Sequence, residues 1–93
     1  MTLALVFADD AVEKMLPELT PTERVAVTDL MAALEIEPRQ GEQQPGYDPN
    51  AEEYIVRLTP KRTAGRGISV VYRFHPYMAS NGACLLRWLI IGP

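Results

Sequence analysis

The chain has 93 residues, of which 47% are hydrophobic, so residues 1–93 are expected to form a single domain around one core. No apolar run approaches the roughly 20 residues that span a bilayer, and a lone cysteine, Cys84, excludes an intrachain disulfide, which favours the cytoplasm and no membrane partner. One histidine and no ligand-like spacing of carboxylates predict neither a metal nor another cofactor.

The net charge of −3 hides a strong asymmetry along the chain. Residues 1–53 hold all 12 carboxylates against three bases, whereas residues 54–93 hold six bases and no acid. The two parts therefore carry −9 and +6. Such an asymmetry predicts a surface that meets an anion, most often a nucleic acid or an acidic protein partner.

The first part of the chain predicts one strand and two helices. A short apolar run at 3–7 is typical of a buried strand, and a brief helix is expected over 11–16. The sequence Thr-Pro-Thr-Glu at 20–23 forms a capping box, because the threonine and the glutamate can satisfy each other's backbone amides. Apolar residues at helical spacing then predict a helix of about four turns that ends at Pro38.

A polar loop at 37–50 separates these helices from a strand-rich second part. The loop is expected to be mobile, because it holds three prolines and no convergent catalytic residue types. Beyond it the pattern has the two-residue period of strands. Strands are predicted over 54–59, 68–74 and 84–91, with a basic turn at 60–67 and a second turn at 80–82.

The last of these strands is apolar on both faces apart from Arg87, so it is expected to be central and covered on both sides. Cys84 and Trp88 are accordingly interpreted as core residues. The expected fold is α+β with the order β-α-α-β-β-β, in which a helical hairpin packs on one face of a mainly antiparallel four-stranded sheet.

Arginines on neighbouring strands are the first candidate for chemistry. Strand alternation places Arg57 and Arg73 on the face away from the main apolar rows. If Arg87 shares that face, three guanidinium groups would line up, which is favourable when a bound anion bridges them. The alternative is three separate arginines, each paired with a carboxylate or exposed at an edge.

The turn between the second and third strands is the next candidate. Lys61, Arg62 and Arg66 could clamp a phosphate backbone, or could simply keep a solvated turn soluble. His75 could act as a general base or acid on a ribose hydroxyl, and its place before a proline also suits a plain strand end. Tyr77, in a loop, could stack on a base.

The order and pattern of the chain resemble those of the RelE/ParE-like toxins of bacterial toxin–antitoxin systems. The likeness spans nearly the whole sequence: a first strand that leads into Phe-Ala-Asp-Asp-Ala at 7–11, a helical hairpin, and a basic meander of three strands. The stretches that resemble this family's strands are Tyr-Ile-Val-Arg-Leu at 54–58, Gly-Ile-Ser-Val-Val-Tyr-Arg-Phe at 67–74 and the run at 85–92.

This resemblance implies a cognate antitoxin as partner and one of two activities. One branch of the family cleaves mRNA on the ribosome without a metal, using lysines and arginines, and another acts on DNA gyrase. Arg57 corresponds to a basic residue on the second strand of the RNA-cleaving branch. Lys61 could replace a nearby lysine, whereas Ser69 stands where an arginine is expected and Arg73 lies further along the strand.

Two hypotheses follow. The first is an endoribonuclease in which His75 or Lys61 removes the 2′-hydroxyl proton while Arg57, Arg73 and Arg66 stabilise the developing charge. The second is a non-catalytic binding module, either a gyrase-type inhibitor or a degenerate toxin that only binds its antitoxin. Two departures from the family pattern favour the second hypothesis. RNA-cleaving members continue with basic and aromatic residues where this sequence stops. They are also strongly basic, whereas this chain has a net charge of −3.

Overall fold

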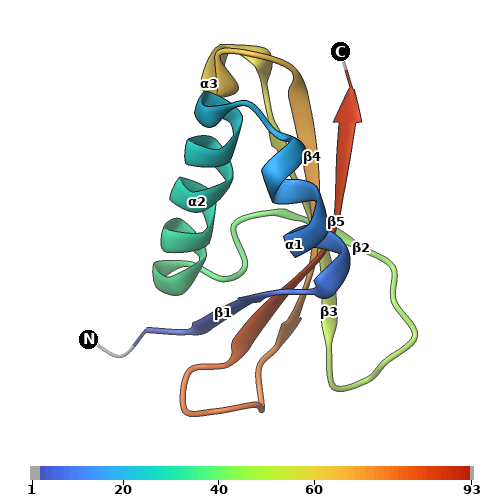
Figure 1. Ribbon diagram of the computed structural model, residues 1–93. Coiled ribbons are helices and arrows are strands. Elements are labelled where there is room, and N and C mark those ends of the chain that lie inside the picture. The colour runs from blue at the N-terminus through green and yellow to red at the C-terminus, as the bar shows by residue number, and fades with distance from the viewer. Residues whose placement is uncertain (1–2, 93) are drawn as a thin grey trace.

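A twisted five-stranded sheet is the framework of the computed structural model, which describes residues 3–92 (Figure 1). The strand order is β1-β5-β4-β3-β2, and the β1–β5 pair is parallel whereas the other neighbours are antiparallel. The strands are β1 (Leu5–Ala8), β2 (Glu42–Gln44), β3 (Glu52–Leu58), β4 (Gly67–His75) and β5 (Ala83–Gly92).

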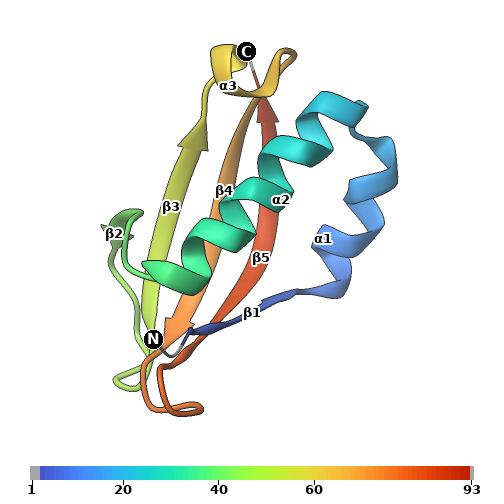
Figure 2. The same cartoon turned by 90° about the vertical axis from the view of Figure 1, so that its left-hand side faces the viewer.

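The helices α1 and α2 cover the same face of this sheet (Figure 2). The capping box predicted at the start of α2 is present: Thr20 Oγ1 accepts from the amide of Glu23, and the Glu23 side chain accepts from the amide of Thr20. The helical segments are α1 (Asp10–Met15), the 3₁₀ turn η1 (Leu16–Glu18), α2 (Pro21–Ile36) and α3 (Pro60–Thr63).

The core lies between these helices and the covered face of the sheet. Along β4 every second side chain is buried there, and along β3 Tyr54 and Leu58 are buried with the partly buried Val56 between them, as the two-residue period predicts. The face of α2 that points to the sheet contributes apolar side chains from Ala26 to Leu34. Core residues include Val27, Leu30, Leu34, Tyr54, Leu58, Val70, Tyr72, Cys84 and Leu86.

The expected α+β class and the order of the main elements are confirmed, but the sheet has five strands instead of four. The additional strand β2 lies inside the segment that was expected to be a mobile loop. Its approach is fixed by Tyr72, whose hydroxyl donates to the carbonyl of Pro38 at 2.8 Å and accepts from the amide of Gly41 at 3.2 Å. This buried tyrosine ties the end of α2 to the sheet, so residues 38–44 are ordered.

A second difference is the short helix α3 in the predicted basic turn. Thr59 has an extended backbone and Pro60 occupies the first helical position, an arrangement that favours a helix start. In the described part of the chain, no helix has the length and apolar character needed to cross a membrane.

Candidate functional site

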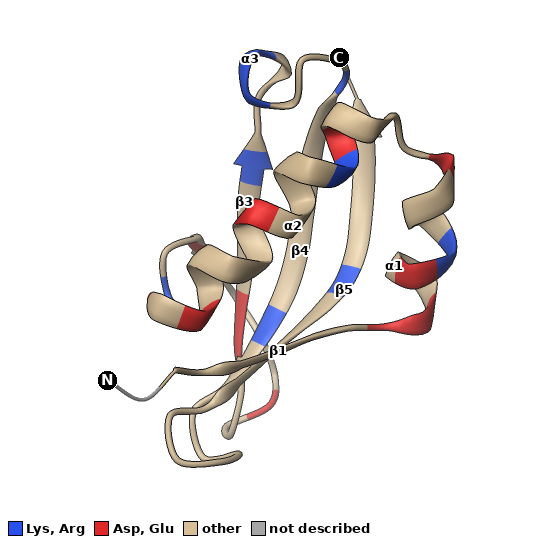
Figure 3. Ribbon diagram, turned by 60° about the vertical axis from the view of Figure 1, so that its left-hand side comes forward, with Lys and Arg blue, Asp and Glu red and all other residues tan. Residues whose placement is uncertain are grey.

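The face of the sheet opposite the helices, which we call the open face, carries the side chains expected to form an arginine row. Arg57 pairs with Ser69 across the β3–β4 ladder, and Arg73 pairs with Glu53. The two arginines therefore share the open face. Because Arg73 lies opposite Glu53, which is four positions before Arg57 on β3, the two arginines are about 13 Å apart along the strands. The blue segments of β3, β4 and β5 lie at different heights along the sheet in Figure 3.

Each of these two arginines has a local partner. The Nε of Arg73 donates to Glu53 Oε2, its direct neighbour across the ladder. Arg57 NH1 donates to Ser69 Oγ at 3.3 Å. An ion pair within the sheet therefore neutralises one of the two charges that were expected to stabilise a phosphate.

Arg87 is the extra residue of a β-bulge. Leu86 pairs with Tyr72 and Trp88 pairs with Val71, so no residue of β4 is the register partner of Arg87. The sequence left open which face of the sheet Arg87 occupies. Because Arg87 is the extra residue of a bulge, the alternation of side chains between the two faces does not assign it to either face. The three arginines do not form the expected row.

A basic apex, which we define as Lys61, Arg62 and Arg66 together with Arg57, lies at the α3 end of the sheet. The side chains of Lys61 and Arg62 are exposed. Arg66 donates through NH2 to Glu23 Oε1 at 2.9 Å and through Nε to Glu23 Oε2 at 3.0 Å. These bonds raise the pKa of Arg66 and hold the pKa of Glu23 well below its usual range.

His75 and Tyr77 lie at the opposite end of the sheet. Together with Asn50 and Met78 they line a surface hollow of about 340 Å³. Gly67, next to the basic apex, and His75 are the two ends of β4, about 26 Å apart by strand geometry. The structure thus brings His75 together with Tyr77 and places Arg73 two residues before it on the same face of β4, but it separates His75 from Lys61, Arg57 and Arg66.

The most prominent surface on the open face was missed by the sequence analysis. Trp88 was expected in the core, but 55% of it is exposed, and β5 is covered on one side only. Phe7, Trp88 and Ile90 are all about half exposed, and the register places them on the open face. The apolar patch, as we call it, comprises Leu5, Phe7, Leu85, Trp88 and Ile90.

A signal for the patch was present in the sequence: β5 is apolar on both faces, which requires a second covering layer. Residues 3–92 supply that layer on one side, through the helices. Cys84, by contrast, is buried as expected, and burial raises the pKa of its thiol to about 12. No group of three or more His, Cys, Asp or Glu side chains in residues 3–92 is arranged to hold a metal ion.

No protein-family model and no curated protein sequence matches the chain. Two solved structures are similar to it. A chain of the archaeal RelE–RelB complex from Pyrococcus horikoshii OT3 has a TM-score of 0.74 and 19% identity, covering 98% of this chain and 96% of that chain. The E. coli toxin RelE, a double arginine-to-alanine mutant in the free state, has a TM-score of 0.65 and 16% identity, covering 96% and 82%.

The chain therefore has a RelE-like toxin fold, as the order of its elements predicted. Because the identities are below 20%, this likeness defines the fold and assigns no role to any residue.

Proposed function

We propose that this protein is the toxin component of a toxin–antitoxin pair, and that it acts by binding proteins. The fold supports the first part, because one similar structure is a RelE–RelB complex and the other is a RelE toxin. The apolar patch supports the second part, since it leaves one face of a two-layer fold uncovered.

The size of the patch fits a protein partner. Four large apolar side chains with about half of their surface exposed, together with the partly exposed Leu85, amount to an area within the roughly 300–600 Å² that is typical of the largest patch on a monomer and is often functional. Aromatic residues such as Trp88 and Phe7 are also the residue types enriched at the centres of protein interfaces. A surface built to track a nucleic-acid backbone would instead place arginines and lysines there.

The partner that we propose for this patch is the cognate antitoxin. Binding there would remove the apolar side chains from water and would cover the face of the sheet that the helices leave open. When the antitoxin is absent, the toxin would bind a protein target of the DNA gyrase type. Such a target, like the antitoxin, is bound without any RNA chemistry.

RNA cleavage on the ribosome is the second candidate, and the basic apex favours it. Arg57 and Arg62 could stabilise a phosphate while the ribose 2′-oxygen, having given up its proton, attacks it and the 5′-oxygen leaves with a proton from water. In this reaction Lys61 would be the base, because His75 lies at the far end of β4. Against cleavage, Arg66 and Arg73 are already paired with carboxylates.

Growth of a bacterial host tests the toxin role. Induced expression of the intact chain should arrest growth, and co-expression of the protein encoded by the neighbouring gene should restore it and form a complex that copurifies. A chain that arrests no growth and forms no complex with the neighbouring gene product would refute the proposal.

RNA integrity separates the two candidates. The purified chain is incubated with mRNA, with and without translating ribosomes, and the products are analysed by primer extension. Intact RNA under every condition, together with growth arrest, supports action through protein binding. Cleavage that Arg57→Ala and Lys61→Ala abolish, while Arg24→Ala leaves it unchanged, would instead establish the endoribonuclease.

A further inference from the structure

We propose that a hollow between α2 and α3 is a docking site for an extended peptide segment of a protein partner, which inserts one branched aliphatic side chain into it. The hollow has a volume of about 320 Å³. That volume lies at the lower end of the range for ligand pockets, and it accommodates an aliphatic side chain with its peptide unit. The site is on the helix side of the molecule, away from the apolar patch.

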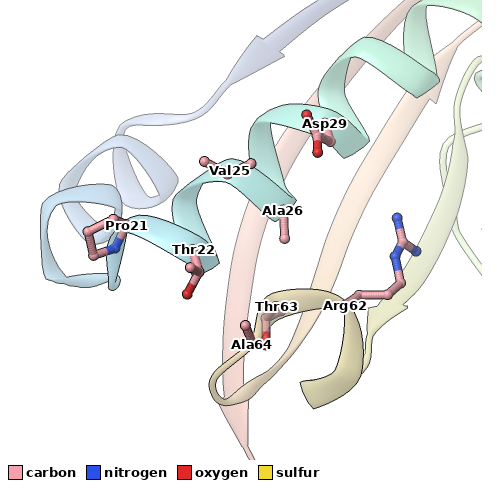
Figure 4. A pocket seen from close by; sticks show the side chains of 8 residues that line it. All are labelled: Pro21, Thr22, Val25, Ala26, Asp29, Arg62, Thr63 and Ala64. Carbon is pink, nitrogen blue, oxygen red and sulfur yellow. The ribbon is translucent and has the colours of Figure 1, made fainter.

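The hollow is lined by small side chains in the middle and by two charged side chains at one end. Ala26 points from α2 toward α3, and the side chains of Thr63 and Ala64 lie opposite it (Figure 4). Pro21 lies near one end of the hollow, whereas Asp29 and Arg62 lie near the other (Figure 4). Small side chains on both helices therefore leave the space that an incoming side chain would fill.

The walls of the hollow are held in place before any ligand arrives. The Thr63 hydroxyl donates to the carbonyl of Arg66 at 2.7 Å and accepts from the amide of Gly65 at 3.1 Å. Ala64 is held in the left-handed region with a φ of 54°. This conformation is unfavourable for alanine, so it persists because the surrounding bonds determine it. A preformed site spends little binding free energy on ordering its own loop.

An exposed apolar residue extends the hollow. Val25 lies on its rim with 58% of its surface exposed, although valine is a weak helix former that gains from packing. An aliphatic side chain that entered the hollow would cover Val25 as well as Ala26. The surface is thus suited to a leucine, an isoleucine or a valine.

The charges at one end of the hollow select a peptide unit over a charged ligand. Asp29 can accept a hydrogen bond and Arg62 can donate one, and neither side chain forms an ion pair within residues 3–92. A peptide group presents one N–H and one C=O, so it complements both residues. An anion would be attracted by one of them and repelled by the other, and the same holds for a cation.

Nuclear magnetic resonance titration tests the site with a defined probe. The ¹⁵N-labelled full chain is titrated with the acetylated and amidated pentapeptide of sequence glycine-alanine-leucine-alanine-glycine. We expect saturable shifts at the amides of Val25, Ala26 and Ala64, with a dissociation constant of about 1 mM, as for a ligand of this size. The same peptide with alanine in place of leucine should bind at least about tenfold more weakly.

Matched variants make the result specific. Val25→Gln should weaken binding about tenfold, whereas Ile36→Gln, at an exposed position 67% accessible on the same helix, should leave it unchanged. Asp29→Asn and Arg62→Gln should each weaken it severalfold without changing the midpoint of urea unfolding by more than the error. The readout does not involve growth or RNA, so its failure would leave the proposed function untouched.

Four results would overturn the proposal. They are the absence of saturable shifts at up to about 20 mM peptide, equal shifts with the leucine and alanine peptides, shifts that centre on the apolar patch, and shifts of the same amides when the protein alone is diluted. The last result would assign the hollow to a second copy of this chain.

Discussion

Glu23 of α2 is completely buried, and both of its carboxylate oxygens are bound by Arg66, which follows it by 43 residues. Its Oε2 also accepts from the backbone amide of Arg66 at 2.9 Å, and its Oε1 from the amide of Thr20 at 2.9 Å. One carboxylate therefore caps α2 and fixes the loop between α3 and β4. This loop belongs to the basic apex and forms one wall of the hollow, so both candidate surfaces depend on Glu23.

Glu23→Gln should lower the stability of the fold, and the loss should depend on pH. Hydrogen bonds from the Arg66 side chain, then from backbone amides, hold the pKa of Glu23 well below its unfolded value of about 4.3. A depressed folded pKa contributes stability above the unfolded pKa, and that stability disappears as the pH falls toward the folded pKa. Urea unfolding should show a large difference between wild type and variant at pH 7 and a small one near pH 2.

Gly65→Ala should destabilise the same loop. A Cβ at this position would lie 2.9 Å from Glu23 Oε2 and 3.3 Å from its Cγ, and that carboxylate cannot move away without breaking its bonds to Arg66. We expect a loss of about 1–3 kcal/mol in the free energy of unfolding. Gly92→Ala is the control, because nothing lies within 4 Å of its Cβ, and an equal loss in both variants would contradict the clash.

Tyr72→Phe should cost about 1–2 kcal/mol, because it leaves the carbonyl of Pro38 and the amide of Gly41 without their partner. Hydrogen exchange should rise at Gly41 and in β2, since this hydroxyl holds the segment against the sheet. Tyr77→Phe serves as the control, as its side chain is 80% exposed. A Tyr72→Phe variant with unchanged exchange in β2 would show that another contact orders the segment.

Alkaline pH should unfold the protein through its two stacked core tyrosines. Burial raises the pKa of both Tyr54 and Tyr72 to about 12, and a hydrogen bond to Glu52 adds to the effect at Tyr54. A raised folded pKa contributes stability below the unfolded value of about 10, which is lost as the pH rises toward 12. Circular dichroism between pH 9 and 12 should show this loss, and it should be smaller in Tyr72→Phe.

Local signals in the sequence predicted the main helices and strands. The features that the sequence did not predict depend on contacts between strands that are distant in the sequence. The capping box at Thr20 and the alternation along β3 and β4 depend only on neighbouring residues, so they could be recognised in advance. The bulge at Arg87 arises from the register between β4 and β5. The strand β2 has the sequence Glu-Gln-Gln, which has little strand character of its own, and it forms because Tyr72 holds its N-terminal flank.

The candidate site shows the same limit. Charge asymmetry predicted a basic surface, but no pattern within the second half of the chain could show that Arg66 would meet Glu23 of the first half. Likewise, a strand that is apolar on both faces does not reveal whether the chain itself supplies both covering layers. Trp88 was therefore placed in the core, although the residues that the structure describes cover only the opposite face of β5.

Trp88→Ser provides the sharpest test of the apolar patch. Because the side chain is about half exposed and no helix within residues 3–92 packs on it, the variant should remain folded, with a loss of about 1–3 kcal/mol from the buried part of the indole. Binding of the copurified antitoxin should weaken by more than about 30-fold, as expected for an aromatic residue at the centre of an interface. Isothermal titration calorimetry measures this change, and Ile36→Ser, on the far side of the molecule, should bind like wild type. Equal affinities for Trp88→Ser and Ile36→Ser would mean that the antitoxin covers another surface, and the open face would then need a different occupant.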